Sequence, residues 1–345
     1  AYSLGTINVN GYGGIINTAV SAADFQAINV NGGFGIISST FGSTGTFNSS
    51  GLIQTDGLGI RNTAIDAGTS INSVTARGEG QRLDVRDYDP RVRFSERGRF
   101  DPESGRWLDG SNDLHRAIGT NRRSSRVSGL TNSGIIENTR ILGEGDLVNG
   151  VRAFAIRAVP RAGAIPGTAE LPPTSSRYPM TISFANSSGT IDVLNNVDGL
   201  QMVTGRIRNF RTGGNVEDLN ASVSGLIANI DIGGILRRTA TFDARGPQGQ
   251  IRDVRVARSL LGRVTSTLDI DGVDVGSLGG TVASVGRINN LTVRGDVLSG
   301  GYARGAKGIG VLRVGGDVLE GGVISARSYG TTRIGGTVFG DVIVD

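Results

Sequence analysis

Short ribbons of alternating aliphatic and polar residues recur along this chain at a regular spacing. Thr6–Gly11 (TINVNG) and Ala27–Gly32 (AINVNG) are near copies, so Ile7 and Ile28 hold equivalent positions. Each is followed by a second match, Gly14–Thr18 (GIINT) and Gly35–Ser39 (GIISS). Because alternate side chains of a strand point to opposite faces, the aliphatic residues of such a ribbon predict the buried face of a short β-strand.

The same spacing returns at the other end of the chain in a sister pattern. Leu291–Val297 (LTVRGDV), Leu312–Val318 (LRVGGDV) and Thr332–Val338 (TRIGGTV) place Val293, Val314 and Ile334 at equivalent positions of one repeat. The Gly-Ile-Ile ribbon also recurs, at Gly59–Thr63, Gly134–Thr139 and, more faintly, Gly234–Thr239.

A period of about 21 residues, built from short aliphatic strands and glycine corners, predicts an all-β fold. We expect a single-stranded parallel β-helix, a β-solenoid of right-handed sense, as one domain over residues 1–345. One coil cannot bury its thin apolar stripe alone, whereas stacked coils share a continuous core. A left-handed hexapeptide helix would need a tighter period of about 18 residues, and tandem β-sandwiches would show hairpin spacing and more core aromatics.

Two segments interrupt the repeat and are predicted to be insertions. Residues 78–126 are highly charged and contain the sole tryptophan, Trp107, and the sole histidine, His115, which indicates a projecting loop or small hairpin. Residues 152–180 are rich in proline, which cannot donate to an interior strand ladder. Aromatic and arginine side chains dominate interface hot spots, so Phe100, Arg106 and Trp107 are the predicted anchors if the first insertion holds a partner.

Composition and charge narrow the class of protein. The 345 residues include 56 glycines, no cysteine and a single lysine, with a net charge of +4. Basic and acidic residues are interspersed, so no nucleic-acid stripe is expected, and no apolar run is long enough to span a membrane. The chain starts at Ala1 without a methionine, which favours an extracellular or cell-surface protein whose signal peptide has been removed.

The strings Val-x-Gly-Asp-Val-x-x-Gly and Gly-Ile-Ile-x-Asn-Thr resemble the glycine-rich parallel β-helix repeats of bacterial surface and secreted proteins, in the broad pectin-lyase-like architecture. The similarity covers about three quarters of the chain. It implies the architecture and leaves the activity open, because this fold carries adhesins, structural proteins and enzymes alike.

The candidate chemistry is sparse. Asp269, Asp271 and Asp274 have the carboxylate density of a calcium loop but lack EF-hand spacing, so no cofactor is predicted and calcium is the one metal considered. A polysaccharide lyase or glycosidase would need a carboxylate pair or a basic residue beside calcium. Because no nucleophile, phosphate-loop or zinc motif is present, we expect a protein that is not an enzyme.

The two ends of the repeat carry the functional prediction. A solenoid whose end coils lack a helical or charged cap exposes unpaired strand edges. We expect a structural protein in which the first coil of one copy stacks on the last coil of the next, giving a filament or surface coat. The predicted contact residues are Leu4, Ile7, Val9, Val338, Val342 and Val344. The alternatives are part of a longer adhesin, a glycan-binding adhesin of cell surface or matrix, and a polysaccharide-degrading enzyme.

Overall fold

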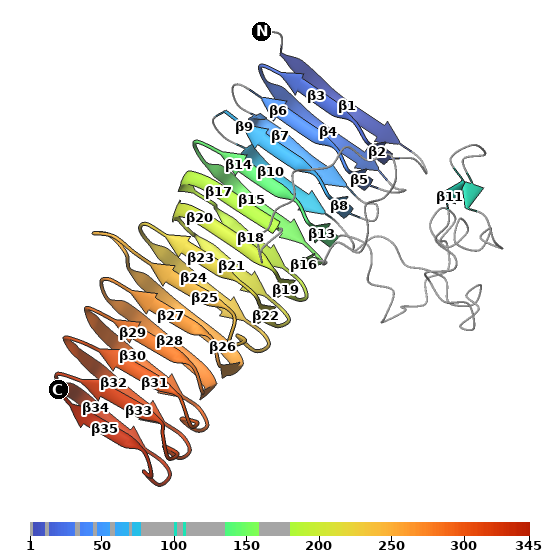
Figure 1. Ribbon diagram of the computed structural model, residues 1–345. Helices are drawn as coiled ribbons and strands as arrows, with labels where there is room; N and C mark the ends of the chain where they lie inside the picture. The colour runs from blue at the N-terminus through green and yellow to red at the C-terminus, as the bar shows by residue number, and fades with distance from the viewer. Residues whose placement is uncertain are drawn as a thin grey trace.

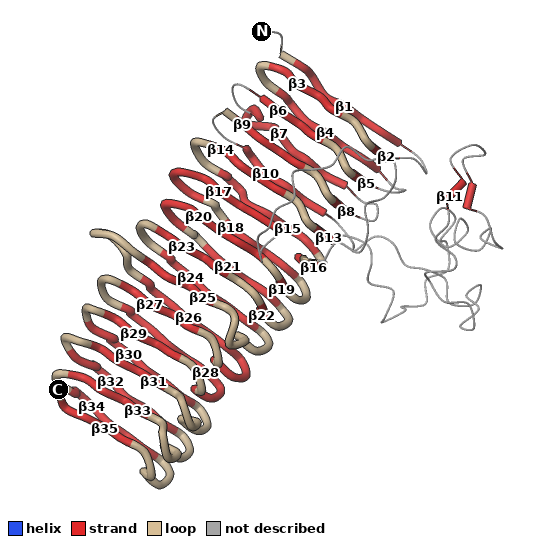
Figure 2. Tube along the Cα trace, in the orientation of Figure 1, coloured by secondary structure: helices blue, strands red, loops and turns tan. Residues whose placement is uncertain are grey.

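The chain folds into a long rod, with its two termini at opposite ends (Figure 1). The computed structural model describes residues 3–10, 14–31, 35–43, 47–55, 59–68, 71–76, 100–101, 106–107, 135–158 and 180–345. Every regular element in these ranges is a β-strand, and they contain no helix (Figure 2). Accordingly, no membrane-spanning helix exists within them.

The strands form three walls that run the length of the rod. Wall A has 13 strands: β1 (Leu4–Asn10), β4 (Phe25–Asn31), β7 (Phe47–Thr55), β10 (Ile71–Ala76), β15 (Leu147–Ala153), β18 (Thr190–Val193), β21 (Asn209–Thr212), β24 (Ile227–Ile232), β26 (Ile251–Leu260), β28 (Ile270–Leu278), β30 (Arg287–Val293), β32 (Gly308–Val314) and β34 (Tyr329–Ile334). Wall B also has 13: β3 (Ala19–Ala22), β6 (Thr40–Ser43), β9 (Ala64–Ala67), β14 (Arg140–Gly143), β17 (Met180–Ser187), β20 (Leu200–Arg206), β23 (Asn220–Val223), β25 (Thr241–Ala244), β27 (Arg263–Ser266), β29 (Thr281–Ser284), β31 (Tyr302–Gly305), β33 (Val323–Ala326) and β35 (Asp341–Val344). Wall C begins with seven: β2 (Gly14–Ile16), β5 (Gly35–Ile37), β8 (Gly59–Arg61), β13 (Ile135–Glu137), β16 (Ala155–Arg157), β19 (Val197–Asp198) and β22 (Val216–Glu217).

Each coil contributes one strand to wall A, one strand to wall B, and a strand or a single bridge to wall C. Successive coils pair in parallel, which confirms the predicted β-solenoid. The repeats found in the sequence stack as expected, with Ile7 beside Ile28 and Val293 beside Val314. The period is less regular than the repeats indicate. The coil from Val273 to its partner Leu291 is shorter than the repeat, whereas the coil from Ile28 to its partner Ile53 is longer. The corners differ in length while the strands keep their register.

Wall C continues past β22 as single bridges. Val216 pairs with Leu236, Leu236 with Leu260, and the series runs on to Val338. The faint repeat at Gly234–Thr239 therefore belongs to the same wall as the clearer ones. Its threonine keeps the same role, since Thr239 Oγ1 accepts a hydrogen bond from the Asp218 N–H at 3.0 Å, as Ser39 Oγ does from the Thr18 N–H at 3.3 Å.

Apolar side chains at equivalent positions of successive coils form inward columns, and these columns are the core. All members of the following columns are at most 7 % exposed. Wall A contributes Val151, Ile191, Phe210, Ile230, Val254, Val273, Leu291 and Leu312. Wall B contributes Phe41, Ile65, Ile141, Ile182, Met202, Ala221, Phe242, Val264, Val282, Ala303 and Ile324. Wall C contributes Ile15, Ile36, Ile60, Ile136, Ile156, Val197, Val216, Leu236, Leu260, Leu278, Val297 and Val318.

The corner between walls C and B explains the Gly-Ile-Ile-x-Asn-Thr string. It places one residue at positive φ in five coils, at Asn17, Ser38, Asn62, Asn138 and Asp218. Asparagine and aspartate tolerate this left-handed conformation better than other residues with a Cβ. The hydroxyl that follows closes the turn, as Thr63 Oγ1 does by donating to the Arg61 carbonyl at 2.8 Å.

The corner between walls A and C explains the Gly-Gly-Asp string. Asp296 Oδ1 accepts the Asp317 N–H at 2.8 Å, and Asp317 Oδ1 accepts the Thr337 N–H at 2.7 Å. The carboxylate reaches the next coil because a glycine faces it. A Cβ on Gly316 would lie 1.9 Å from Asp296 Oδ1, and one on Gly336 would lie 2.0 Å from Asp317 Oδ1.

The structure corrects the boundary of the second insertion. Residues 152–157 complete the regular strands β15 and β16, and Met180 begins β17, so the solenoid extends into both ends of the predicted segment 152–180. The prolines that marked that segment start at Pro160 and lie outside the described residues. The alternation of inward and outward residues continues up to Arg157. It therefore marks the end of the regular strands more accurately than the prolines do.

Within the first insertion, β11 (Phe100–Asp101) and β12 (Arg106–Trp107) form an antiparallel pair. This agrees with the predicted hairpin. Phe100 and Trp107 are register partners, as are Asp101 and Arg106. The rest of residues 78–126, including His115, lies outside the described residues, and a partner for the predicted anchors Phe100, Arg106 and Trp107 stays a prediction.

Shortening Phe242 to alanine tests the stacked core. The Phe210 and Phe242 rings meet edge to face with centroids 4.9 Å apart, and both side chains are fully buried. We expect Phe242→Ala to lower the free energy of unfolding by about 3–5 kcal/mol, measured by urea denaturation. Val203→Ala, at a position that is 46 % exposed on the outside of wall B, should cost less than about 0.5 kcal/mol. Equal losses would contradict the assigned core.

Adding one methyl group at the Gly-Gly-Asp corner should be costly. Gly316→Ala forces the new Cβ against Asp296 Oδ1, whereas a Cβ on Gly5 meets nothing within 4 Å. We expect Gly316→Ala to lower the midpoint of thermal unfolding and to cost more than about 1 kcal/mol, with Gly5→Ala nearly neutral. A neutral Gly316→Ala would show that the corner does not have this geometry.

Candidate functional site

The residues predicted to join neighbouring copies lie in the first and last coils of the described rod. Leu4, Ile7 and Val9 occupy wall A, while Val338 belongs to wall C and Val342 and Val344 to wall B. Each stands in an inward column. The members of these columns one coil further in are fully buried, whereas Leu4 is 37 % exposed, Val338 45 % and Val344 68 %. The end coils therefore present core side chains without a covering coil.

The last coil also contains a polar group that bridges the core. Tyr329 takes the position that Ile309 holds in the preceding coil. Its hydroxyl group lies 2.9 Å from the Ile324 carbonyl oxygen and 2.8 Å from that of Ile343, to which it donates. Burial, assisted by the negative charge of Asp345, raises the pKa of Tyr329 to about 12. The hydroxyl therefore remains protonated, with both of its contacts made to carbonyl groups of the rod itself.

The three calcium candidates each have a separate protein partner. Asp269 Oδ1 accepts the Arg287 N–H at 2.7 Å, and Asp271 Oδ1 accepts from Asn289 Nδ2 at 3.0 Å. Asp274 pairs with Arg294, whose Nε lies 3.0 Å from its Oδ1. Among the described residues, no three metal-ligating side chains of the His, Cys, Asp or Glu types gather into a group that could hold an ion.

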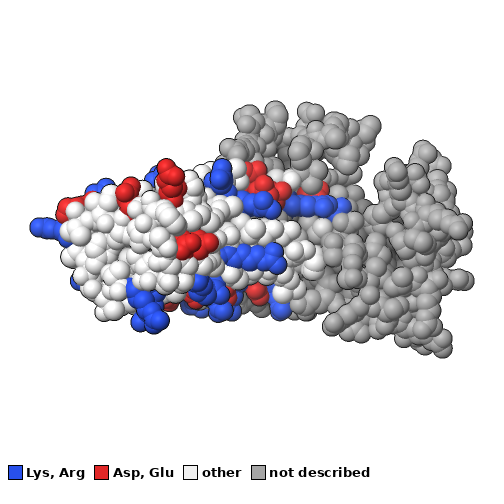
Figure 3. Space-filling model, turned by 90° about the horizontal axis from the view of Figure 1, so that it is seen from below, with Lys and Arg blue, Asp and Glu red and all other residues white. Residues whose placement is uncertain are grey.

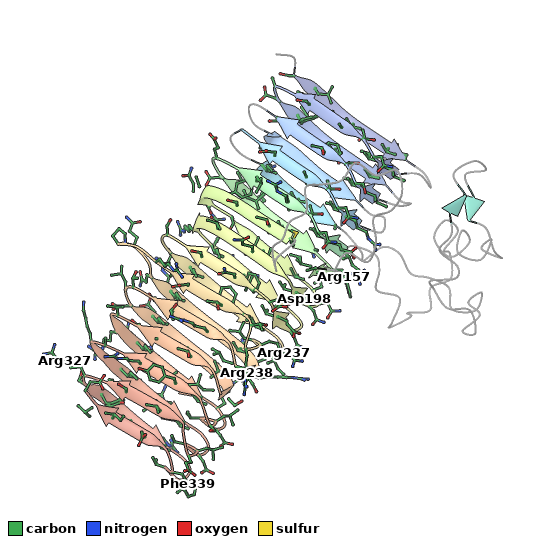
Figure 4. The ribbon with its side chains drawn as sticks, in the orientation of Figure 1. Arg157, Asp198, Arg237, Arg238, Arg327 and Phe339 are labelled. Atoms are coloured by element: carbon green, nitrogen blue, oxygen red, sulfur yellow. The ribbon has the colours of Figure 1, made fainter. Side chains whose placement is uncertain are left out.

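Charged residues gather instead on the outer face of wall C, in a column that the sequence analysis missed. We call this the C column: it comprises Arg61, Glu137, Arg157, Asp198, Glu217 and Arg237, one residue from each successive coil. Figure 4 shows Arg157, Asp198 and Arg237 following one another along one edge of the rod, with Arg238 beside them. Because each member follows an inward residue of wall C, aligning the coils on that wall would have revealed the column.

In the first half of the C column, a negative side chain lies between two positive ones. Glu137 lies in register between Arg61 and Arg157, and its Oε2 is 2.7 Å from Arg157 Nε, with the glutamate side chain only 12 % exposed. Burial lowers the pKa of Arg61 from its usual value; the charge of Glu137 opposes this shift and that of Arg157 adds to it. Opposite charges on adjacent strands stabilise such a ladder.

The second half is electrostatically strained. Asp198 and Glu217 are direct register partners, and Asp218 follows at the corner. Burial raises the pKa of Asp198, and the negative charges of Asp218 and Glu217 raise it further. A half-buried carboxyl group with a raised pKa, beside two other carboxyl groups and with arginines on either side, has the elements of an acid–base pair or an acidic-sugar subsite.

By its architecture the chain is a parallel β-solenoid. No family model matches it, and neither a curated protein nor a solved structure matches it.

Neutralising Asp198 should stabilise the rod at neutral pH. A carboxyl group whose pKa is higher in the folded than in the unfolded state adds nothing while both states are protonated. It becomes destabilising as pH rises from the unfolded pKa through the folded one. We expect Asp198→Asn to raise the thermal midpoint at pH 7 through a gain of roughly 0.2–1 kcal/mol, the scale of a cross-strand like-charge pair, and the gain to vanish at acidic pH. Asp192→Asn is the matched control, because Asp192 pairs with Arg152 at 3.7 Å. A loss of stability at pH 7 would contradict the assignment.

Proposed function

We propose that this chain is an extracellular structural protein that assembles head to tail, the last coil of one copy stacking on the first coil of the next. Two features of the end coils support the proposal. The first is that several inward columns end on aliphatic residues that are only partly covered, at Leu4, Ile7 and Val9 in the first coil and at Val338, Val342 and Val344 in the last. The wall A column of Leu312 ends instead on Thr332. The strand edges at both ends also carry backbone groups of the kind that pair with a neighbouring coil everywhere else in the rod.

The second feature lies outside the core and is the one that carries the proposal. Beyond the charged C column, the outer positions of wall C turn apolar towards the last coil, through Leu261, Leu298, Leu319 and Phe339. At the other end, the same outer position holds Ile16 and Ile37. Phe339 is 64 % and Ile16 41 % exposed.

Stacking the two ends in register would make these halves one continuous apolar strip. Phe339 of one copy would then neighbour Ile16 of the next, in the geometry that already places Leu319 beside Phe339. Burying such residues removes apolar surface from water at a gain of about 25 cal/mol per Å2. A contact between different surfaces does not close on itself, and therefore gives a filament.

An extracellular location is part of the same proposal. The resemblance of the repeats to those of secreted and surface β-helices supports it. In the view of Figure 3, basic and acidic side chains are scattered among uncharged residues, and neither sign covers the described face. That distribution fits a coat or fibre component better than a nucleic-acid binder.

A second candidate function is supported by the carboxylates of the C column. An enzyme acting on acidic polysaccharide would use Asp198, whose pKa is raised by burial and by nearby negative charge, as the proton donor. Glu217 would be the second carboxyl group, and Arg157 or Arg237 would bind the sugar acid. Asp198→Asn would then abolish depolymerisation of a uronic-acid polymer that the intact protein cleaves. Under the structural proposal, the intact protein cleaves no such polymer.

A charge placed on one end of the rod should stop elongation. Val344→Arg adds a cation to an exposed side chain of the last coil, where stacking would desolvate it. We expect the intact protein to form filaments in negative-stain images and the particles of Val344→Arg to stay one rod long. Val285→Arg, at a position that is 63 % exposed on the side of the rod, should leave the filaments unchanged.

Blocking opposite ends in two preparations gives a sharper result. Ile16→Arg obstructs the first coil and Val344→Arg the last, so particles of each variant alone should stay one rod long, while a mixture should reach two rod lengths and no more. Single rods in the intact protein at every concentration, or elongation of Val344→Arg alone, would overturn the proposal.

A further inference from the structure

The outer face of wall A carries a second column of charges, with strict alternation of sign. Its six members are register partners from one strand to the next: Arg152, Asp192, Arg211, Asp231, Arg255 and Asp274. We call them the A column. Each lies between two buried residues of its strand, so that its side chain points outward. The three arginines are exposed and the three aspartates half-buried.

The charges in the middle of the A column are not used within the chain. At its ends, Arg152 pairs with Asp192 at 3.7 Å and Asp274 with Arg294 at 3.0 Å. By contrast, Arg211, Asp231 and Arg255 make no ion pair or side-chain hydrogen bond with the described part of the chain. These three charged side chains follow one another about 4.8 Å apart. They are therefore available to form hydrogen bonds with a partner.

We propose that wall A is the docking face for a second copy of this chain, which lies antiparallel and face to face with the first. The reason is the order of the charges in the column. When an alternating series of positive and negative charges with an even number of members is laid against its own reversed copy, each positive charge meets a negative one. The two copies are related by a two-fold axis that runs along the strand direction, midway between β21 and β24. This axis reverses the order of the coils in the second copy. It also places each outer column of wall A opposite the same column of that copy.

Under this symmetry every charge of the A column meets its opposite. Arg211 faces Asp231 of the second copy, Asp192 faces Arg255, and Arg152 faces Asp274. Each contact occurs twice, because the two copies are equivalent. A slide by one coil would instead place arginine on arginine and aspartate on aspartate, so the charges define one register and reject its neighbours.

The columns on either side of the A column obey the same symmetry. On one side, Asn209 faces Asn229, and Thr190 faces Asp253, which gives hydrogen-bonding pairs without like charges. On the other side, Gly213 faces Gly233, and both follow the inward residue of their strand with no side chain. The two glycines leave room for the arginine side chains next to the two-fold axis, and one coil further out the exposed Leu194 faces Ala257.

Beyond the six coils the symmetry opposes no like charges, since at the third coil further out Asn29 faces Arg333. One coil further out Thr75 stands opposite Thr292, but Thr75 is only 8 % exposed and adds little surface there. A single exposed ion pair contributes only about 0–1 kcal/mol, so the strength has to come from many coils acting together. Wall A, with its 13 strands, provides that length. A standard interface needs about 800 Å2 on each partner.

This inference is independent of the head-to-tail proposal, because it concerns the side of the rod and not its ends. The test therefore uses the Val344→Arg background, in which elongation is expected to be blocked. The measurement is mass by sedimentation equilibrium, with small-angle scattering to separate a thicker particle from a longer one. We expect the mass to double with little change in length, and the association to weaken at least tenfold between low and high salt as screening increases.

Charge reversal then tests the register. Arg211→Asp or Asp231→Arg alone puts like charges against each other at the two-fold axis, and each should weaken pairing by more than about tenfold. A mixture of the two variants should restore it as a one-to-one complex, because aspartate then faces arginine again. The double variant Arg211→Asp/Asp231→Arg should also pair with itself, although it stacks like charges within each rod. Circular dichroism of every variant checks that the solenoid is intact.

A role confined to the single rod predicts something else: each of the three variants places two pairs of like charges on neighbouring strands, so all three would be destabilised to a similar extent and neither the mixture nor the double variant would associate. The proposal fails if the starting protein stays a single rod at low salt, if the mixture does not recover, or if pairing ignores the reversals. Doubling in length instead of thickness would also contradict it, and would point to the ends of the rod.

Discussion

The in-register stacking of parallel strands is the constraint on which the rest of this structure depends. Once Ile7 pairs with Ile28 and Val293 with Val314, every residue of a coil is about 4.8 Å from its counterpart in the next. Each position is thereby multiplied into a column along the rod. Apolar columns form a continuous core although no single coil is stable alone. In the same way, like charges at one position would repel each other in every coil of the column.

The outside of the rod shows how charge is handled under this constraint. In the A column arginine and aspartate alternate through six coils, and in the first half of the C column Glu137 lies between two arginines. Where the alternation fails, at Asp198 and Glu217, burial together with the neighbouring negative charges raises the pKa of Asp198. Like charges also meet at Arg313 and Arg333, which are exposed register partners near the last coil of wall A.

The sequence was sufficient to predict the architecture, the stacking of its clearest repeats and the end-coil positions of Leu4, Ile7, Val9, Val338, Val342 and Val344. The charged columns could not be found by applying a fixed period. The coil that leads from Asp231 to Arg255 is longer than the one that leads from Arg255 to Asp274, yet both pairs are in register. Corners of unequal length absorb the difference, and only the paired strands reveal which residues share a column. The anchors expected in the first insertion depend on contacts with a partner, which no repeat encodes.

The central claim is that the stacking inside one chain continues between chains, and X-ray diffraction from aligned assemblies tests it most directly. Head-to-tail stacking predicts a meridional reflection at about 4.8 Å, since the strands run across the fibre, and an axial repeat of one rod length, about 60 Å for 13 strands. A 4.8 Å reflection on the equator would contradict the claim, and an axial repeat of two rod lengths would show that like ends meet.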